Sequence, residues 1–171
     1  MTKMIFSSSA YVARDWQSLF QAVVAAAAAL LGLLFVAASI RVEVVNESAR
    51  HRARAREALG QLLVLVVVGV LVLIPGQTRE VLGVELIILG VIVAVVTARL
   101  QVNTIRRLSP QLRRQWLIRD MTYNIGVVTI PLAGLGLVLG ALGGLYWLMV
   151  STVLFFIWAS LQAWWLLVES R

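Results

Sequence analysis

YNIGVVTIPLAGLGLVLGALGGLYWLMVSTVLFFIWASLQAWWLLV, residues 123–168, contains no charged side chain, and this run constrains how the whole chain is organised. A single helix of this length would extend roughly 69 Å, about twice the thickness of the hydrocarbon core of a bilayer. We therefore expect two membrane-spanning helices. Glycine adopts positive φ freely, so the break is predicted at Gly143 and Gly144, which places the spans at 123–142 and 145–168.

The composition of the 171-residue chain agrees with a lipid environment. Hydrophobic residues make up 61% of the chain and charged residues 13%, whereas a soluble domain carries about 25% charged residues. With so few charges, a water-exposed surface would contain large apolar patches. The chain has no cysteine and one histidine, His51. These counts exclude disulfides, thiolate ligands and a histidine-based metal site within one chain, and no cofactor is expected.

Three further hydrophobic segments precede this run, at 16–40, 59–74 and 81–98. The second is the shortest, and we expect its helix to continue back through Arg56, whose long side chain can reach the interface. Pro75 and Gly76 end it, and the short linker that follows predicts a helical hairpin. The predicted fold class is all-α: a single transmembrane domain, residues 1–171, made of five spanning helices.

The distribution of basic residues predicts the orientation. Twelve of the 15 lysine and arginine residues lie in the loops at 41–58 and 99–122 or in the C-terminal tail. By the positive-inside rule these parts are cytoplasmic, so the N-terminus is predicted outside and the C-terminus inside. Aromatic belts at both interfaces agree with this orientation. The expected outer belt is Tyr11, Trp16, Tyr146 and Trp147, and the inner belt is Trp116, Tyr123, Trp164 and Trp165.

Small residues recur at intervals of four in several segments. Such spacing places them on one helix face, where the missing side chains let two backbones approach. This face is either packing within one bundle or an interface between subunits, which could surround a pore. The residues concerned are Gly136, Gly140 and Gly144 in the fourth span, Gly90, Ala94 and Ala98 in the third, and Ala25, Ala28, Ala29 and Gly32 in the first.

Glu85 is the one carboxylate inside a predicted span. An ionisable group in hydrocarbon is costly unless it is paired or hydrated, so a functional role is one hypothesis. The other is that Glu85 reaches the outer headgroups, close to Arg79 and Glu80. Gln21 also falls in the outer third of the bilayer, and it could face Glu85 as part of an intramembrane polar site.

Arginine clusters mark the predicted cytoplasmic side. In 109–120, Ser109 and Pro110 are typical of a helix start, and Leu112, Trp116 and Leu117 share one side, which predicts a short amphipathic helix at the interface. The clusters are either a topology signal or a contact for anionic lipids or an acidic partner. Nucleic acid is not expected as a partner, because no recognition module accompanies the basic residues. The residues are Arg50, Arg52, Arg54, Arg56, Arg106, Arg107, Arg113 and Arg114.

The first span, Trp16 and then AVVAAAAALLGLLFVAASI at 22–40, resembles the opening helix of small uncharacterised polytopic bacterial membrane proteins, some of which carry protease-modulator labels. The likeness covers about 20 residues. It implies a bacterial plasma (inner) membrane and an undefined role, and no functional residue is carried over from it.

The sequence contains no nucleophile–base set, phosphate-binding loop or helical metal motif. We therefore expect a non-enzymatic membrane protein that is a homo-oligomer or a structural or regulatory subunit of a larger complex. The alternative is a small oligomeric ion channel or transporter whose glycine-rich faces surround a pore.

Overall fold

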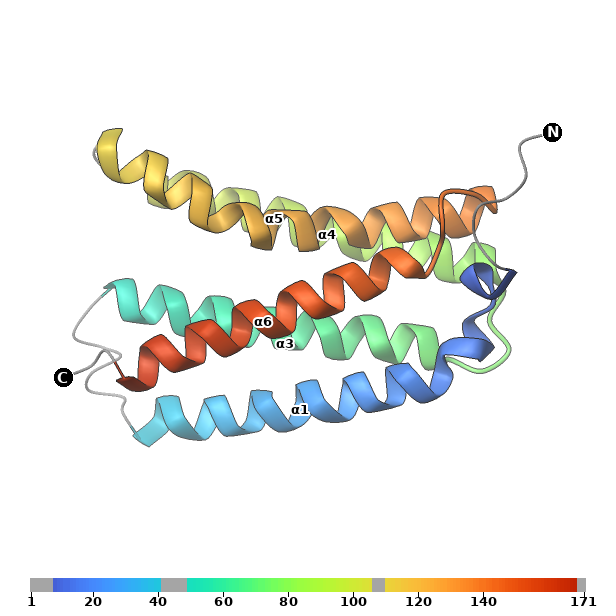
Figure 1. Cartoon of the computed structure of the whole chain (residues 1–171), viewed down its shortest axis with the longest axis horizontal. Coiled ribbons are helices and arrows are strands. Elements are labelled where there is room, and N and C mark those ends of the chain that lie inside the picture. Colours follow the sequence, from blue (N-terminus) through green and yellow to red (C-terminus); the bar gives the residue numbers. More distant parts are fainter. Residues whose placement is uncertain (1–7, 41–48, 106–109, 169–171) are drawn as a thin grey trace. The chain divides into compact units, whose positions relative to one another are not determined.

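The computed structural model describes residues 8–40, 49–105 and 110–168, and every regular element in these ranges is a helix. Two short 3-10 helices, η1 (Ser8–Tyr11) and η2 (Ala13–Trp16), lead into α1 (Gln17–Ile40). The remaining helices are α3 (Ala49–Leu73), α4 (Arg79–Ile105), α5 (Pro110–Leu139) and α6 (Tyr146–Val168) (Figure 1). The predicted all-α class is confirmed.

Three helical segments are long and apolar enough to cross a membrane: Ala13–Ile40, Ala55–Leu73 and Arg79–Val102. Two further apolar segments, Tyr123–Leu139 and Tyr146–Gln162, are shorter. The described helices are therefore compatible with a membrane location, and three of the five predicted spans meet the length and composition that a bilayer requires.

The chain divides into two compact units. The α4–α5 unit consists of Met1–Asp15 and Pro75–Ser151, so it includes the first residues of α6. The α1–α3 unit consists of Trp16–Ile74 and Thr152–Arg171, which contains the rest of α6.

In the α1–α3 unit, α1 and α3 lie side by side (Figure 1). The buried residues of α1 recur with helical periodicity and form one face of that helix. Gly69 of α3 approaches the backbone of α1: a methyl group in its place would meet the side chain of Val24 and lie 3.6 Å from the carbonyl oxygen of Phe20. The buried positions are Phe20, Val23, Ala27 and Leu34 in α1, and Leu62, Leu65, Val68 and Val72 in α3.

In the α4–α5 unit, two glycines bring α4 and α5 into backbone contact. A Cβ at Gly83 would lie 2.8 Å from the carbonyl oxygen of Gly134, and a Cβ at Gly134 would lie 2.5 Å from that of Gly83. Further along the pair, Gly90 leaves room for the ring of Pro131. This proline lies inside α5, where it cannot donate a backbone hydrogen bond. The contacts fix an antiparallel register between the two helices.

Two hydrogen bonds hold the other end of the same helix pair. The hydroxyls of Thr97 and Tyr123 are 3.0 Å apart, and the Gln101 side-chain amide donates to Asn124 at 2.9 Å. Interhelical bonds of this kind typically add about 0.6 kcal/mol each inside a membrane, so backbone packing carries most of the association.

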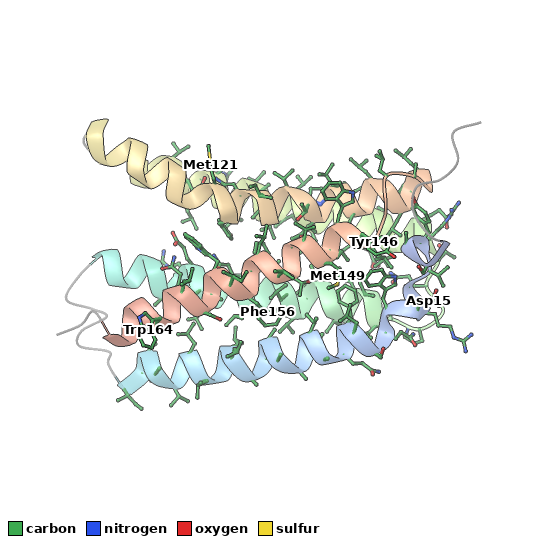
Figure 2. All side chains as sticks on the ribbon, viewed as in Figure 1. Asp15, Met121, Tyr146, Met149, Phe156 and Trp164 are labelled. Atoms are coloured by element: carbon green, nitrogen blue, oxygen red, sulfur yellow. The ribbon has the colours of Figure 1, made fainter. Side chains whose placement is uncertain are left out.

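Large apolar side chains remain exposed along the helices, with Ile40 at 78% and Leu33 at 69% relative exposure. Figure 2 shows carbon-rich side chains projecting from all the helices, with Trp164 towards the end of α6. A water-soluble domain rarely exposes continuous apolar surface of this kind, whereas lipid tails solvate it without penalty.

The helix boundaries differ from the predicted ones in four places. The helix of the second span begins at Ala49 rather than 59, as its predicted continuation through Arg56 requires, and α4 extends beyond 98 to Ile105. The helix predicted at 109–120 does begin at Pro110, as its start signal indicates, but it is continuous with the fourth span: α5 runs without interruption from Pro110 to Leu139, because no glycine or proline stands between Pro110 and Gly126. The fourth span ends at Leu139 instead of 142.

Candidate functional site

A carboxylate of the α1–α3 unit, Glu57, lies near the start of the α3 segment that is long enough to cross a membrane. The side-chain amide of Gln162, from α6, donates a hydrogen bond to its carboxylate at 3.1 Å. Gln162 is buried, and Glu57 is half-buried. A carboxylate held by an amide from a second helix is one way in which a charge inside a membrane protein is stabilised.

Gln61 lies one turn after Glu57 on α3, and residues four apart share a helix face. Its side chain is 1% exposed, and neither its amide nitrogen nor its amide oxygen has a hydrogen-bond partner. A buried amide in this state is unfavourable, since each unsatisfied group retains its full desolvation penalty of about 1–3 kcal/mol. Glu57, Gln61 and Gln162 together form what we term the α3–α6 polar site.

A second carboxylate, Glu85, lies near the start of α4 in the α4–α5 unit. It is half-buried and accepts a hydrogen bond from the side-chain amide of Gln77, in the linker before α4, at 2.5 Å. The amide oxygen of Gln77 is buried and has no partner. The predicted neighbours Arg79 and Glu80 form an ion pair with each other instead, with both side chains about half exposed.

Gln21 was a residue that could face Glu85; the amide observed to bond this carboxylate belongs to Gln77. Gln21 is exposed on α1, in the α1–α3 unit. Glu85 is thus stabilised by the linker that precedes its own helix, a contact within eight residues of sequence.

A buried hydroxyl pair joins α5 to the second turn of α6 within the α4–α5 unit. The hydroxyls of Thr129 and Ser151 are 2.5 Å apart, and both lie within hydrogen-bonding distance of the carbonyl oxygen of Gly126, at 2.9 and 3.0 Å. Because each hydroxyl has a single hydrogen, one donates to the other and the other donates to the carbonyl. Pairs of this kind are ordinary connections between membrane helices, and they satisfy both hydroxyls locally.

The turn between α5 and α6 is the most unusual backbone in the described chain. Gly140, Gly143 and Gly144 all have positive φ, and so does Leu142 at 64°. The N-terminal segment covers this turn: the Gly143 amide donates to the hydroxyl of Tyr11 at 3.1 Å, and the Leu145 amide donates to the carbonyl of Ala10 at 2.8 Å. The indole of Trp147 donates to the Leu142 carbonyl at 2.6 Å.

This turn corrects the prediction that Gly136, Gly140 and Gly144 share one helix face. Because α5 ends at Leu139, Gly140 and Gly144 lie in the turn, where their positive φ is the feature that requires glycine. A methyl group at Gly144 would collide with the carbonyl oxygen of Ala10. Gly136 packs against the returning chain at Gly144.

The other small residues fall into two groups. Gly90 packs against Pro131, Ala94 is half-buried and Ala98 is exposed. In α1, the whole predicted set is exposed, and a methyl group at Gly32 would meet nothing within 4 Å; the exposed set is Ala25, Ala28, Ala29 and Gly32.

Of the eight arginines predicted to contact anionic lipids or a partner, one has a described side chain. Arg56 is exposed. Two of the others, Arg106 and Arg107, lie outside the described residues. The remaining five are on α3 or α5, in stretches where only the backbone is described: Arg50, Arg52, Arg54, Arg113 and Arg114. Among the described residues, no group of three or more acidic, histidine or cysteine side chains could hold a metal ion.

Sequence reasoning missed the α3–α6 polar site and the Gly83–Gly134 contact. One signal was available for the first: the helix was expected to continue back through residue 56, which brings Glu57 onto the face of Gln61. For the second, Gly83 lies seven residues before Gly90 on the same side of α4, and this spacing is not one of the intervals of four by which the small-residue faces were identified.

Searches against protein-family models, curated proteins and solved structures found no match.

Proposed function

We propose that this protein is a non-enzymatic subunit of a membrane complex, with a structural or regulatory role, in the plasma membrane of a bacterium. Five spans are part of the proposal. The 30 residues of α5 and the 23 residues of α6 correspond to roughly 45 Å and roughly 35 Å of helix, enough for one crossing each.

The observation that carries the proposal is the exposed small-residue face of α1. With about 100° between successive residues, Ala25, Ala29 and Gly32 lie opposite the face through Ala27 and Leu34 that is buried. A methyl group at Gly83 or Gly134 would meet neighbouring backbone, whereas one at Gly32 would meet nothing within 4 Å, as is also the case at Gly60 of α3. Small residues on a lipid-exposed helix allow a helix of another subunit to approach closely.

The test is the native mass in mild detergent of wild type, Gly32→Leu and Ala26→Leu. We expect wild type to exceed the 18.8 kDa of one chain, or to retain an unlike subunit, and Gly32→Leu to lose that partner. Ala26 is exposed on the flank of α1, so Ala26→Leu should keep the wild-type mass. A wild type that remains a single chain, both in detergent and after cross-linking in membranes, would contradict the proposal.

Anionic lipids at the cytoplasmic face are proposed as further partners. Arg56 and Arg99, at one end of α3 and towards the end of α4, are exposed basic side chains that lipid headgroups could contact. Basic residues beside a membrane gain about 1 kcal/mol each from an anionic surface.

A small channel or transporter is the second candidate, and the α3–α6 polar site favours it. Polar groups within a spanning helix often mark an ion or substrate path. Ion flux into proteoliposomes should then depend on Glu57, and Glu57→Gln should reduce or abolish it. Glu85→Gln is the matched variant in the other unit, because Gln77 already bonds that carboxylate locally. Absence of flux in wild type would remove this candidate and leave the subunit role.

A further inference from the structure

Gln61 presents an unmet hydrogen-bonding requirement in the interior of α3. Its amide has two donor hydrogens and an acceptor oxygen, and neither polar atom has a partner although the side chain is 1% exposed. The residue lies roughly 9 Å along the helix from Ala55 and roughly 18 Å from Leu73, the ends of the apolar segment. At this depth lipid offers no partner, so a partner must come from inside the protein.

The chemistry of the amide restricts what this partner is. A metal cation would satisfy the oxygen and leave the nitrogen unsatisfied, and an anion would do the reverse. Water donates and accepts, so it satisfies both atoms. A buried water needs two to four polar partners. Glu57 lies one turn away on the same face, and Gln162 is bonded to Glu57.

We infer that Glu57, Gln61 and Gln162 form a buried water-binding site between α3 and α6. Water in this site accepts from the Gln61 amide nitrogen and donates to its amide oxygen, and it extends the Glu57–Gln162 hydrogen bond towards the middle of α3. The site belongs to the α1–α3 unit alone, and it holds whether the protein is a subunit or a channel.

The site can be tested by water-edited solid-state NMR on protein with 15N-labelled glutamine and backbone amides in proteoliposomes. The Gln61 side-chain signal is assigned by its loss in Gln61→Leu and in the closer-sized Gln61→Met, so that one poorly folding variant does not prevent assignment. Leu65 and Val68, further along α3, are buried apolar residues whose backbone amides serve as dry controls.

We expect magnetisation to pass from water to the Gln61 amide several-fold faster than to the Leu65 and Val68 amides. In Gln61→Met the Gln162 amide should also lose part of its transfer, since the two side chains share the site. Transfer to Gln61 no faster than to the controls would show a dry amide and overturn the inference. Transfer at Gln61 with an unchanged Gln162 signal in Gln61→Met would overturn the shared site.

Discussion

Glycine performs two different tasks in this chain, and the neighbours of each glycine distinguish them. A methyl group at Gly134 would lie 2.5 Å from the Gly83 carbonyl oxygen and 2.9 Å from the Ile87 backbone nitrogen, where no flexible side chain can move aside. At Gly32 the same methyl group would meet nothing. Gly134 therefore permits the packing of α4 on α5, whereas Gly32 leaves a surface open.

This distinction predicts opposite results for two identical substitutions. Gly134→Ala should destabilise the protein by about 1–3 kcal/mol through overpacking. Gly32→Ala should be neutral or stabilise it by up to about 1 kcal/mol, because alanine is the better helix former. Thermal unfolding of both variants in mild detergent measures the difference. Equal melting temperatures would mean that α4 and α5 are not in backbone contact at Gly134.

Leu142 has the backbone conformation of a glycine without being one. Its φ of 64° is rare for a large side chain, and the left-handed region costs an L-residue about 1–2 kcal/mol. The side chain is 57% exposed, so little packing would be lost on its removal.

Leu142→Gly should consequently stabilise the fold, by about 0.5–1 kcal/mol once the greater freedom of glycine in the unfolded chain is subtracted. Leu139→Gly is the matched control: this residue is similarly exposed but ends α5 in helical conformation, so glycine should destabilise there. Chemical or thermal unfolding compares the two. A destabilised Leu142→Gly would show that its side chain makes contacts that outweigh the strain.

At the scale of elements, the N-terminal segment holds the turn between α5 and α6 through two hydrogen bonds, which we term the N-terminal clasp. It supplies one backbone carbonyl, from Ala10, and one side-chain hydroxyl, from Tyr11, to amides that the turn cannot satisfy itself. Residues separated by more than 130 positions are thereby joined at one end of the α4–α5 unit.

Removing the tyrosine hydroxyl tests the clasp without changing its apolar surface. Tyr11→Phe leaves the Gly143 amide unpaired, which should weaken local closure by about 0.5–1.5 kcal/mol. Hydrogen exchange at Gly143 should then accelerate by roughly a factor of 2 to 10, at 1.4 kcal/mol per tenfold, while amides within α1 are unaffected. Val12→Ala, at an exposed neighbour without a role in the turn, is the control. Unchanged exchange at Gly143 would mean that the hydroxyl does not hold this turn.

The elements that sequence reasoning located correctly are those with strong local signals. Pro75 and Gly76 ended the second span within a residue of the observed end of α3 at Leu73, because proline cannot continue a helix and Gly76 adopts φ of 72°. The break after the fourth span was placed a few residues late. Any of the glycines at 136, 140, 143 and 144 could have ended the helix. The residue at which α5 ends is linked to the N-terminal clasp, a contact far away in the sequence.

The polar site was harder to foresee, because a hydrogen bond between α3 and α6 joins residues 105 positions apart. The expected continuation of the second helix through Arg56 already placed Glu57 one turn before Gln61, but nothing in the sequence indicated that α6 would supply Gln162 as its partner. Glu85 was recognised at once, since it stands alone in an apolar run, but its partner came from the linker. Sequence identifies the buried charge more readily than the group that satisfies it.

At the scale of the whole molecule, we expect charge rather than packing to determine the orientation in the membrane. The helices expose apolar side chains along their length, so a bilayer would accept either orientation of the chain from burial alone. The asymmetry lies in the basic residues, twelve of which fall in 41–58, 99–122 and the C-terminal tail, ranges that include the first turns of α3 and α5. Translocation of these segments is disfavoured, which predicts that they remain cytoplasmic.

Single-cysteine labelling tests this orientation cleanly, because the natural chain has no cysteine. Ser8→Cys, in η1 near the N-terminus, should react with a membrane-impermeant maleimide in intact spheroplasts. Ala53→Cys, in the arginine-rich start of α3, should react only after the membrane is permeabilised. Both variants keep every basic residue, so neither alters the charge asymmetry being tested, and denatured samples verify that each thiol can react. Labelling of Ala53→Cys in intact spheroplasts, with protection of Ser8→Cys, would reverse the orientation. Labelling of both from outside would mean that the number of crossings between them is even, which contradicts a spanning α1.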